Sequence, residues 1–349
     1  MSSTVVIDPS KIHEISELKH QNPLTTLRVD PTGRFVAAGA QDLDVQLWNL
    51  QDGNHFSLAG HKSWVRSIDF SSDGTLMYTA CWGGTIKIWD LSHEIPALKR
   101  SFLAHQGAAR WVRLSPDGER LATAGNDLSV KLWNAESGDL QHQFSGHERH
   151  VYGVDFHPDG EHLVSQDLMG NVLVWDLKTN QKQRQIDASV MTGYDKKFAA
   201  DMGGARDMQF NADGALFASA GITKVVNSFA GIQDPIIVVF DWKTGETVKQ
   251  LRAADKFKGV AWGVRFHPQG LTIGVGAEKS GKGEVWFYKD DEDKAFHTHA
   301  LKSAARALDL VDEQRLAIAH ADGSVRLYQM TAEPGVADES QGPTETKAK

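Results

Sequence analysis

One stretch of the chain decides the fold: residues 60–90 read GHKSWVRSIDFSSDGTLMYTACWGGTIKIWD. It contains three alternating apolar runs separated by two short turns, in the order Val65 to Phe70, Ser71 to Gly74, Leu76 to Ala80, Gly83-Gly84 and Thr85 to Asp90. Apolar alternation bounded by Asp-Gly or Gly-Gly turns is typical of an antiparallel meander. The stretch therefore predicts three consecutive strands, the last of which ends at the aromatic residue Trp89.

The same unit recurs along the chain. Seven short apolar strands end in an aromatic residue: Trp48, Trp89, Trp133, Trp175, Phe240, Tyr288 and Tyr328. By subtraction, their spacings are 41, 44, 42, 65, 48 and 40 residues. A period of about 40–45 residues with Gly-His and Trp-Asp dipeptides is typical of propeller blades. We therefore expect an all-β fold, a seven-bladed β-propeller of four-stranded antiparallel blades.

The expected propeller is a single domain over residues 1–330. Its seventh unit supplies only three strands, from about Ala305 to Tyr328, and would leave a strand edge open. Residues 11–18 alternate like an outer strand, so we expect them to complete the last blade and close the ring. Residues 331–349 have almost no apolar content, which predicts a disordered tail.

Composition narrows the class of protein. The net charge of −8 argues against nucleic-acid binding driven by the charge of the whole molecule. A single cysteine, Cys81, permits a reducing compartment and is more typical of a core residue than of a nucleophile. The chain shows no signal-peptide pattern and no apolar run long enough for a membrane span. We therefore expect a soluble, cytoplasmic monomer that binds neither nucleic acid nor membranes.

The repeats resemble the WD-repeat family over roughly residues 11–330. That family has a buried hydrogen-bonded set in a blade: a His, a Ser or Thr on the second strand, an Asp in the tight turn, and the Trp. The third unit matches this blade tetrad with His105, Thr123, Asp127 and Trp133. Other units match in part, and Gly83 and Met169 stand where the turn Asp is expected in units two and four. The insertion in the fifth unit looks like that of bacterial WD-repeat proteins, so we expect a bacterial member.

The repeat is interrupted near one group of loops. By subtraction, insertions near residues 186–204 and 222–233 add 12 and 11 residues, and a smaller one lies around residues 278–283. In a meander, the loops joining blades and those joining strands two and three open on one face, which we name the top face. We expect a raised wall there. The alternative is that these loops are neutral, because surface insertions cost little.

A second pattern marks the start of each inner strand, five residues after the His position. The residues there are Thr25, Arg66, Arg110, Tyr152, Arg206, Trp262 and Arg306. In WD-repeat proteins this position, the one two residues earlier and the one just before the turn Asp line the partner site. The resemblance therefore implies ten partner-binding residues: Trp64, Arg66, Trp82, Arg110, Asn126, His150, Tyr152, Arg206, Trp262 and Arg306.

Four arginines at one channel mouth favour an acidic or phosphorylated protein or peptide as the partner. The alternative is that each arginine pairs with an acid and holds the blades together; the candidates are Asp195, Asp201 and Asp207.

Motifs for catalysis or metal binding fail on inspection. Residues 276–283 mimic a phosphate loop, but Gly283 stands in place of the magnesium-binding hydroxyl and the segment joins two strands. His297 and His299 lack an indicated third ligand. We therefore expect no catalytic residue, metal or cofactor, and a non-enzymatic protein-interaction scaffold. The alternative is a small-ligand-binding or enzymatic propeller that uses the channel mouth.

Overall fold

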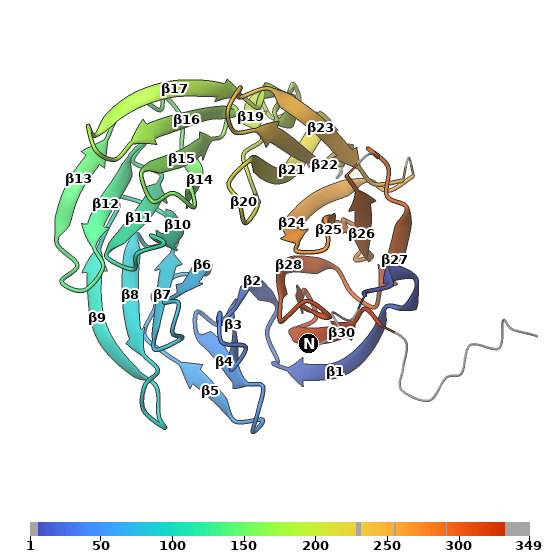
Figure 1. The fold of residues 1–349 in the computed structure, drawn as a ribbon, viewed down its shortest axis with the longest axis horizontal. Helices are drawn as coiled ribbons and strands as arrows, with labels where there is room; N and C mark the ends of the chain where they lie inside the picture. Colours follow the sequence, from blue (N-terminus) through green and yellow to red (C-terminus); the bar gives the residue numbers. More distant parts are fainter. Residues whose placement is uncertain (1–5, 228–231, 255, 291, 332–349) are drawn as a thin grey trace, which may run out of the picture.

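The computed structural model describes residues 6–227, 232–254, 256–290 and 292–331. These residues form seven four-stranded antiparallel sheets arranged as blades around a central axis (Figure 1). The expected seven-bladed β-propeller is confirmed. Among the residues described, no helix is long and apolar enough to cross a membrane.

Within each blade, the strands follow one another from the channel outward. Blades 1 to 3 consist of β2 (Leu24–Val29), β3 (Phe35–Ala40), β4 (Val45–Asn49) and β5 (His55–Leu58); β6 (Val65–Phe70), β7 (Leu76–Cys81), β8 (Thr85–Asp90) and β9 (Ala97–Leu103); and β10 (Ala109–Leu114), β11 (Arg120–Gly125), β12 (Val130–Asn134) and β13 (Leu140–Phe144).

Blades 4 to 6 consist of β14 (Val151–Phe156), β15 (His162–Asp167), β16 (Asn171–Asp176) and β17 (Gln181–Asp187); β20 (Asp207–Phe210), β21 (Leu216–Asn227), β22 (Ile232–Asp241) and β23 (Thr247–Arg252); and β24 (Gly259–His267), β25 (Leu271–Glu278), β26 (Gly283–Lys289) and β27 (His297–Leu301). Blade 7 has β28 (Ala305–Leu310), β29 (Arg315–His320), β30 (Ser324–Gln329) and β1 (His13–Lys19). The other elements are the hairpin β18 (Gly193–Asp195) and β19 (Ala200–Met202), and the short 3-10 helices η1 (Pro9–Lys11) and η2 (Ser189–Met191).

The N-terminal strand closes the ring, as the sequence predicted. β1 pairs antiparallel with β30, and Leu18 lies opposite Val325. Arg326 of β30 donates to Glu17 of β1 at 2.7 Å, so a charged pair supports the backbone ladder. The strand begins at His13 rather than residue 11, because Lys11 belongs to η1. The predicted tail lies outside the described residues except for Thr331.

The core lies between adjoining blades. Each of seven clusters of buried apolar side chains takes its members from two neighbouring blades. In β7, Met77 and Cys81 pack toward blade 1 whereas Tyr78 and Ala80 pack toward blade 3. Successive side chains of a strand point to opposite faces, so a blade buries both of its faces at once.

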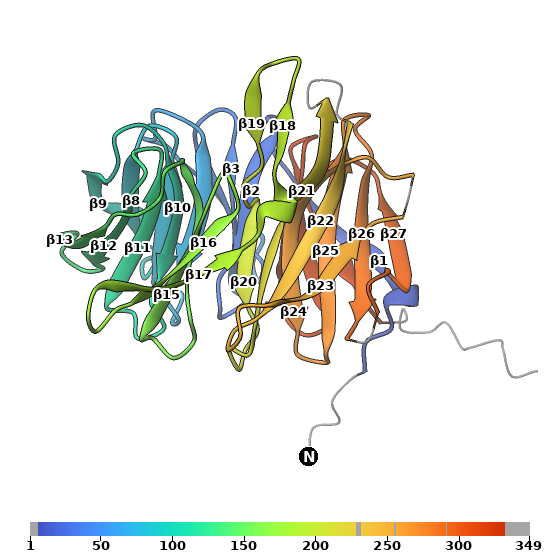
Figure 2. The same cartoon turned by 90° about the horizontal axis from the view of Figure 1, so that it is seen from above.

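Both large insertions extend from the same face of the ring (Figure 2). The first forms η2 and the hairpin β18–β19, and the second lengthens β21 and β22. Thr223 of β21 donates to the carbonyl of Val190 at 2.6 Å, and Gly193 is so close to Val225 that an added Cβ would lie 2.9 Å from the Val225 Cβ. The two insertions therefore support each other. Part of the second, including Phe229, lies outside the described residues.

Candidate functional site

A register irregularity at the start of the inner strands aims side chains at the channel. In six blades the ladder skips one residue there: Thr25, Arg66, Arg110, Tyr152, Trp262 and Arg306. Such a bulge leaves one residue outside the pairing and redirects its side chain. In blade 5, Arg206 stands immediately before β20 and its backbone N–H bonds to Ala220. The sequence pattern therefore corresponds to one recurring backbone device.

These residues line a single cavity of about 330 Å³, which we name the mouth pocket. Seven of the ten predicted partner-binding residues line it: Arg66, Trp82, Arg110, Tyr152, Arg206, Trp262 and Arg306. Asn126 borders it by accepting from Arg110 Nε at 2.5 Å, and Trp64 packs on Trp82 with ring centroids 5.4 Å apart. His150 is exposed and does not belong to the lining. The structure therefore brings nine of the ten residues together.

Two aromatic rings hold the four guanidinium groups. Tyr152 lies 4.0 Å from Arg110 and 5.4 Å from Arg206, measured from guanidinium carbon to ring centroid. Trp262 lies 5.2 to 6.0 Å from Arg306, Arg206 and Arg66 in the same measure. Cation–π contacts of this kind fix the guanidinium planes without neutralising their charge.

Within the described part of the chain, none of the four arginines has a carboxylate within salt-bridge distance. The acids considered as partners are engaged elsewhere: Asp207 pairs with Arg265, Asp201 lies 3.8 Å from Arg149, and Asp195 accepts from the backbone N–H of Lys197 at 3.0 Å. Among the described residues, none of these three acids is seen to pair with a mouth arginine.

The pKa of each of the four mouth arginines is lowered, and burial is the largest cause. Burial lowers the pKa of Arg66 to about 10, and the charges of Arg206, Arg110 and Arg306 add to the decrease. Burial likewise lowers the pKa of Arg110, Arg206 and Arg306. All four stay protonated at neutral pH, so the mouth pocket is a local positive site in a chain of net charge −8.

Sequence reasoning missed a second layer of charge beneath the mouth pocket. It contains one residue from each blade and is named the inner ring: Arg28, Asp69, Arg113, Asp155, Asp207, Arg265 and Asp309. Six of these follow the mouth position by three residues. Val65 and Ile68 are also three residues apart across the bulge of β6, and both belong to the same core cluster. Residues at this spacing therefore point to the same face of the strand. The spacing was a signal that could have revealed the inner ring.

The inner ring links neighbouring blades. Arg265 pairs with Asp207 and, at 2.6 Å, with Asp309, while Arg28 lies 3.5 Å from Asp69 and 3.8 Å from Asp309. Asp309 also accepts from the backbone N–H of Val29 at 2.9 Å. These charges are paired, unlike those of the mouth.

The blade tetrad of blade 3 forms one hydrogen-bonded chain. Asp127 Oδ1 accepts from His105 Nδ1 at 2.7 Å, and His105 Nε2 lies 2.7 Å from the hydroxyl of Thr123. That hydroxyl also accepts from Trp133 Nε1 at 2.9 Å. The tetrad therefore ties the loop before β10 to the two middle strands of its blade.

Blades 2 and 4 differ from this pattern in opposite ways. In blade 2, Gly83 offers no carboxylate, and the buried His61 Nδ1 has no partner in the structure. In blade 4, Asp167 supplies the carboxylate that Met169 lacks and lies 3.1 Å from His147 Nδ1. Asp167 stands at the position of blade 4 that Gly125 holds in blade 3, at the same distance along the chain from the blade histidine. A side chain at this position lies next to that histidine, since a Cβ added at Gly125 would be 2.4 Å from the ring of His105. In blade 4 the carboxylate expected at position 169 is therefore supplied by Asp167, two residues earlier.

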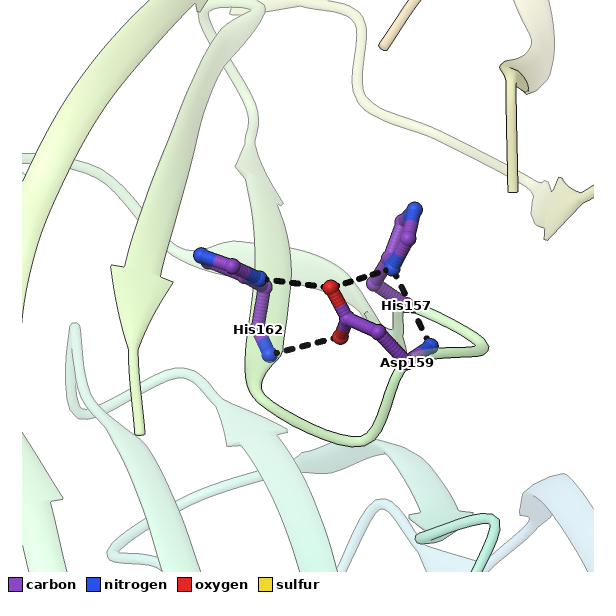
Figure 3. A group of neighbouring side chains, drawn as sticks. All are labelled: His157, Asp159 and His162. Carbon is purple, nitrogen blue, oxygen red and sulfur yellow. Dashed lines mark hydrogen bonds and ion pairs between the residues drawn. The ribbon is translucent and has the colours of Figure 1, made fainter. Parts of the chain in front are cut away.

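Within the described ranges, one group of side chains could hold a metal: His157, Asp159 and His162 have ligand atoms within 4.8 Å of one another (Figure 3). Both Nδ1 atoms lie 2.8 Å from Asp159 Oδ2, but His157 Nε2 also donates to Gly214 of the next blade at 3.0 Å. His267 makes the same kind of contact, because its Nε2 donates to the carbonyl oxygen of Glu313 in its next blade at 2.7 Å. The Nδ1 of each histidine accepts from a backbone N–H two residues later, that of Asp159 or of Gln269. These matching contacts of His157 and His267 indicate that both histidines link turns of adjoining blades.

The other motifs remain structural. Residues 279–282 form the turn between β25 and β26, so a strand and not a helix follows the phosphate-loop mimic. His297 and His299 lie on β27, and no third ligand joins them within the described ranges. Cys81 is a buried member of the core.

A family model described as WD domain, G-beta repeat, matches residues 12–49, 54–90, 97–134 and 138–176. Each match begins near the outer strand of one blade and ends with the third strand of the next, which is the offset that β1 creates by closing the ring. These four repeats, together with the seven-bladed ring, support a WD-repeat family for this chain.

The chain is also similar to parts of longer proteins. It is 32% identical over 122 residues to the periodic tryptophan protein 2 homolog of Schizosaccharomyces pombe, covering 32% of this chain and 13% of that protein. It is 28% identical over 138 residues to the protein groucho of Drosophila melanogaster, covering 38% and 19%. It is 28% identical over 127 residues to the nuclear distribution protein PAC1 of Arthroderma benhamiae, covering 35% and 27%. These relatives are eukaryotic, so the expected bacterial origin is not supported.

Proposed function

We propose that this protein is a non-enzymatic interaction scaffold that binds an acidic protein or peptide segment over the mouth pocket on its top face. The observation that carries the proposal is a set of four clustered arginines without a carboxylate partner among the described residues. Buried or half-buried charges are normally paired within a protein. An anionic segment of a partner would supply the missing charge.

The surroundings of the mouth pocket suit a protein partner. Trp64 and Trp82 are 37% and 41% exposed beside it, and Arg and Trp are the residue types that most often dominate binding energy. A negatively charged molecule with one positive site also directs an anionic segment to that site. The WD-repeat matches are consistent with an interaction role, while cytoplasmic location and a monomeric state stay predictions.

The test compares fluorescent peptides that share a Gly-Ser-Trp framework and carry either a Glu cluster or a Lys cluster. We expect the Glu peptide to bind, the Lys peptide not to bind, and the affinity to fall as salt is raised. The double variant Arg66→Ala, Arg306→Ala should lose Glu-peptide binding by about 100-fold, since charge-assisted hydrogen bonds contribute about 1.5–3 kcal/mol each. Unchanged melting of the variant is the control for folding. Undiminished binding to a folded variant would refute the proposal.

A small anionic ligand is the second candidate, because a cavity of about 330 Å³ lies within the range of small-molecule sites. Native mass spectrometry of the purified protein distinguishes the two candidates. A bound metabolite that the double variant does not retain would favour this ligand over a protein segment.

A further inference from the structure

Two layers of arginine in the same channel differ in how their charge is balanced. In the inner ring, Arg28, Arg113 and Arg265 each lie within 4.0 Å of an aspartate carboxylate. At the mouth, no carboxylate of the described chain reaches Arg66, Arg110, Arg206 or Arg306 to that distance. The channel therefore pairs its deeper arginines and leaves the four upper ones unpaired within the described chain. Asp207 also lines the mouth pocket, but it is paired with Arg265.

The mouth guanidiniums keep hydrogen-bond donors available. Arg66 Nη1 donates to the carbonyl oxygen of Thr25 at 3.3 Å, and Arg206 Nη1 donates to that of Gly203 at 3.1 Å. Arg110 donates from Nε to the side-chain oxygen of Asn126. A guanidinium has five N–H donors in a planar fork, so these bonds orient each group while using only part of it. The aromatic contacts of Tyr152 and Trp262 fix the planes of the forks.

We propose that the mouth pocket takes the phosphoryl group of a phosphorylated side chain on the bound protein segment. The inference rests on the proposed function and specifies its partner. A phosphate monoester carries about −1.5 to −2 charge at neutral pH and three strong acceptor oxygens, whereas a carboxylate carries one charge and two oxygens. Several forks around one pocket match a tetrahedral group with several acceptors, because each guanidinium can bind two oxygens at once.

The depth and rim of the pocket favour a protein source for the phosphoryl group. Arg28, Arg113 and Arg265 belong to the pocket lining, so the paired inner ring forms its floor and a ligand reaches it from the top face. Trp64 and Trp82, whose rings contact each other at a tilt of 41°, are partly exposed at the rim. A free phosphate ion would leave this apolar surface unused, whereas residues flanking a phosphorylated side chain would cover it.

The test uses three degenerate peptide libraries on the full chain, each with one fixed central residue: phosphoserine, glutamate or serine. We expect the phosphoserine library to bind at least about tenfold more tightly than the glutamate library, and the serine library not to bind. The double variant Arg66→Gln, Arg306→Gln should weaken phosphoserine binding by about 100-fold. Arg100→Gln with Lys182→Gln, two exposed cations on outer strands, removes the same charge elsewhere and should leave binding unchanged.

A measurement on the unmodified protein avoids dependence on the folding of a variant. The second ionisation of a phosphate monoester has a pKa near 6, whereas a sulfate ester keeps one charge throughout. Phosphoserine peptides should therefore lose affinity from about pH 7.5 to about pH 5.5, toward that of matched sulfoserine peptides, whose affinity should not change. Equal pH profiles for both would contradict the proposal.

The outcomes separate this inference from the proposed function. If glutamate peptides bind as tightly as phosphoserine peptides and both are lost in the Arg66, Arg306 variant, the phosphoryl assignment is overturned and the acidic-segment scaffold stands. If inorganic phosphate or free phosphoserine competes at the same concentration as the peptides, a protein source is overturned. If a folded Arg66, Arg306 variant binds every library as the parent does, both proposals are refuted.

Discussion

His61 is buried in blade 2 with Nε2 2.7 Å from the hydroxyl of Thr79, and its Nδ1 has no hydrogen-bond partner among the residues that the structure describes. Blade 3 provides a carboxylate at the equivalent place, since Asp127 follows His105 by the same 22 residues that separate Gly83 from His61. An unpaired buried polar atom costs about 1–3 kcal/mol. The tetrad of blade 2 therefore lacks only the turn carboxylate, because Gly83 stands where blade 3 has Asp127.

Gly83→Asp should stabilise the protein by about 1 kcal/mol, because its carboxylate would accept from His61 Nδ1. The site has room, since an added Cβ would lie 3.5 Å from its nearest neighbours and Gly83 does not need a positive φ. The measurement is the urea midpoint. Gly84→Asp is the matched control and should destabilise strongly, because Gly84 has a φ of +80° and an added Cβ would lie 2.1 Å from the carbonyl oxygen of His105.

The same substitution should change the response to acid. Burial, with the charge of Lys87, lowers the pKa of His61 from 6.5 to about 4. The unfolded chain then binds a proton that the folded protein refuses, so stability is lost as the pH falls from 6.5 toward 4. In Gly83→Asp the pKa of His61 should rise, as followed by NMR titration, and this loss should shrink. An unchanged His61 titration would show that the carboxylate does not reach the ring.

Asp127→Ala should cost about 1–3 kcal/mol in the free energy of unfolding, because it leaves His105 Nδ1 and the amine of Lys131 without their carboxylate. Burial by itself raises the pKa of Asp127, but the bonds from His105, Ser129 and Lys131 hold this pKa well below its usual value. That contribution is present above the usual pKa of an Asp and is lost in stronger acid. Glu136→Ala, at an exposed turn residue, is the control. An unchanged urea midpoint for Asp127→Ala would exclude the tetrad as a source of stability.

At the scale of single elements, β1 has a role that its position in the sequence does not suggest. It pairs with β30 and places Glu14 and Glu17 against Lys302 and Arg326. Without it, β30 would become an exposed edge strand. One N-terminal strand therefore decides whether blade 7 is complete.

Deleting residues 1–19 should lower the melting temperature markedly, because it removes a whole ladder and two charged contacts from blade 7. Deleting residues 335–349 should leave the melting temperature unchanged, since the sequence there predicts no packed structure. Differential scanning calorimetry of both truncations is the measurement. Similar effects of the two deletions would contradict closure by β1 as the main contribution of the N-terminal segment.

At the scale of the whole molecule, the inner ring joins residues from all seven blades and its members are not equivalent. Burial raises the pKa of Asp309, but Arg265 and Arg28 outweigh it and hold this pKa below its usual value. For Asp155, burial outweighs the attraction of Arg113 and Arg28 and raises the pKa to about 6. The ionised form of Asp309 is therefore stabilised by its surroundings, whereas the ionised form of Asp155 is destabilised by burial.

Asp309→Asn should destabilise by about 3–5 kcal/mol at neutral pH, because it leaves Arg265 and Arg28 short of a buried partner. Asp155→Asn should cost much less. Since its pKa is raised from 3.8 to about 6 in the folded state, the parent loses stability relative to this variant as the pH rises from about 3.8 to about 6, and no further loss follows above that pH. Urea unfolding at about pH 4 and at about pH 7 is the measurement, with Asp312→Asn as an exposed control. Equal costs for the two ring variants would disprove this division of roles.

The blades and their number could be predicted from the sequence because each blade is built from local signals. Alternation, Asp-Gly turns and a closing aromatic residue lie within about 40–45 residues, and strand pairing in a meander is between neighbours in sequence. The mouth positions of Arg66 and Arg306 were also readable, since a bulge at the same place in each inner strand repeats with the blade. His150 lies outside the lining of the mouth pocket, although Trp64 at the same position of blade 2 packs beside it, so the loop positions were less readable than the strand positions.

The sequence by itself determined the repeat, the closure of the ring and the clustering of arginines at one mouth, because these follow from periodic local patterns. Only the tertiary structure decided which charges are balanced: Arg28 meets Asp309, and Arg265 meets both Asp207 and Asp309, across blades far apart in the chain. It also showed that Asp167 replaces the missing turn carboxylate and that the two insertions pack together. The physical reason is that ion pairing depends on distances of a few ångströms, which ring closure sets and no local pattern encodes.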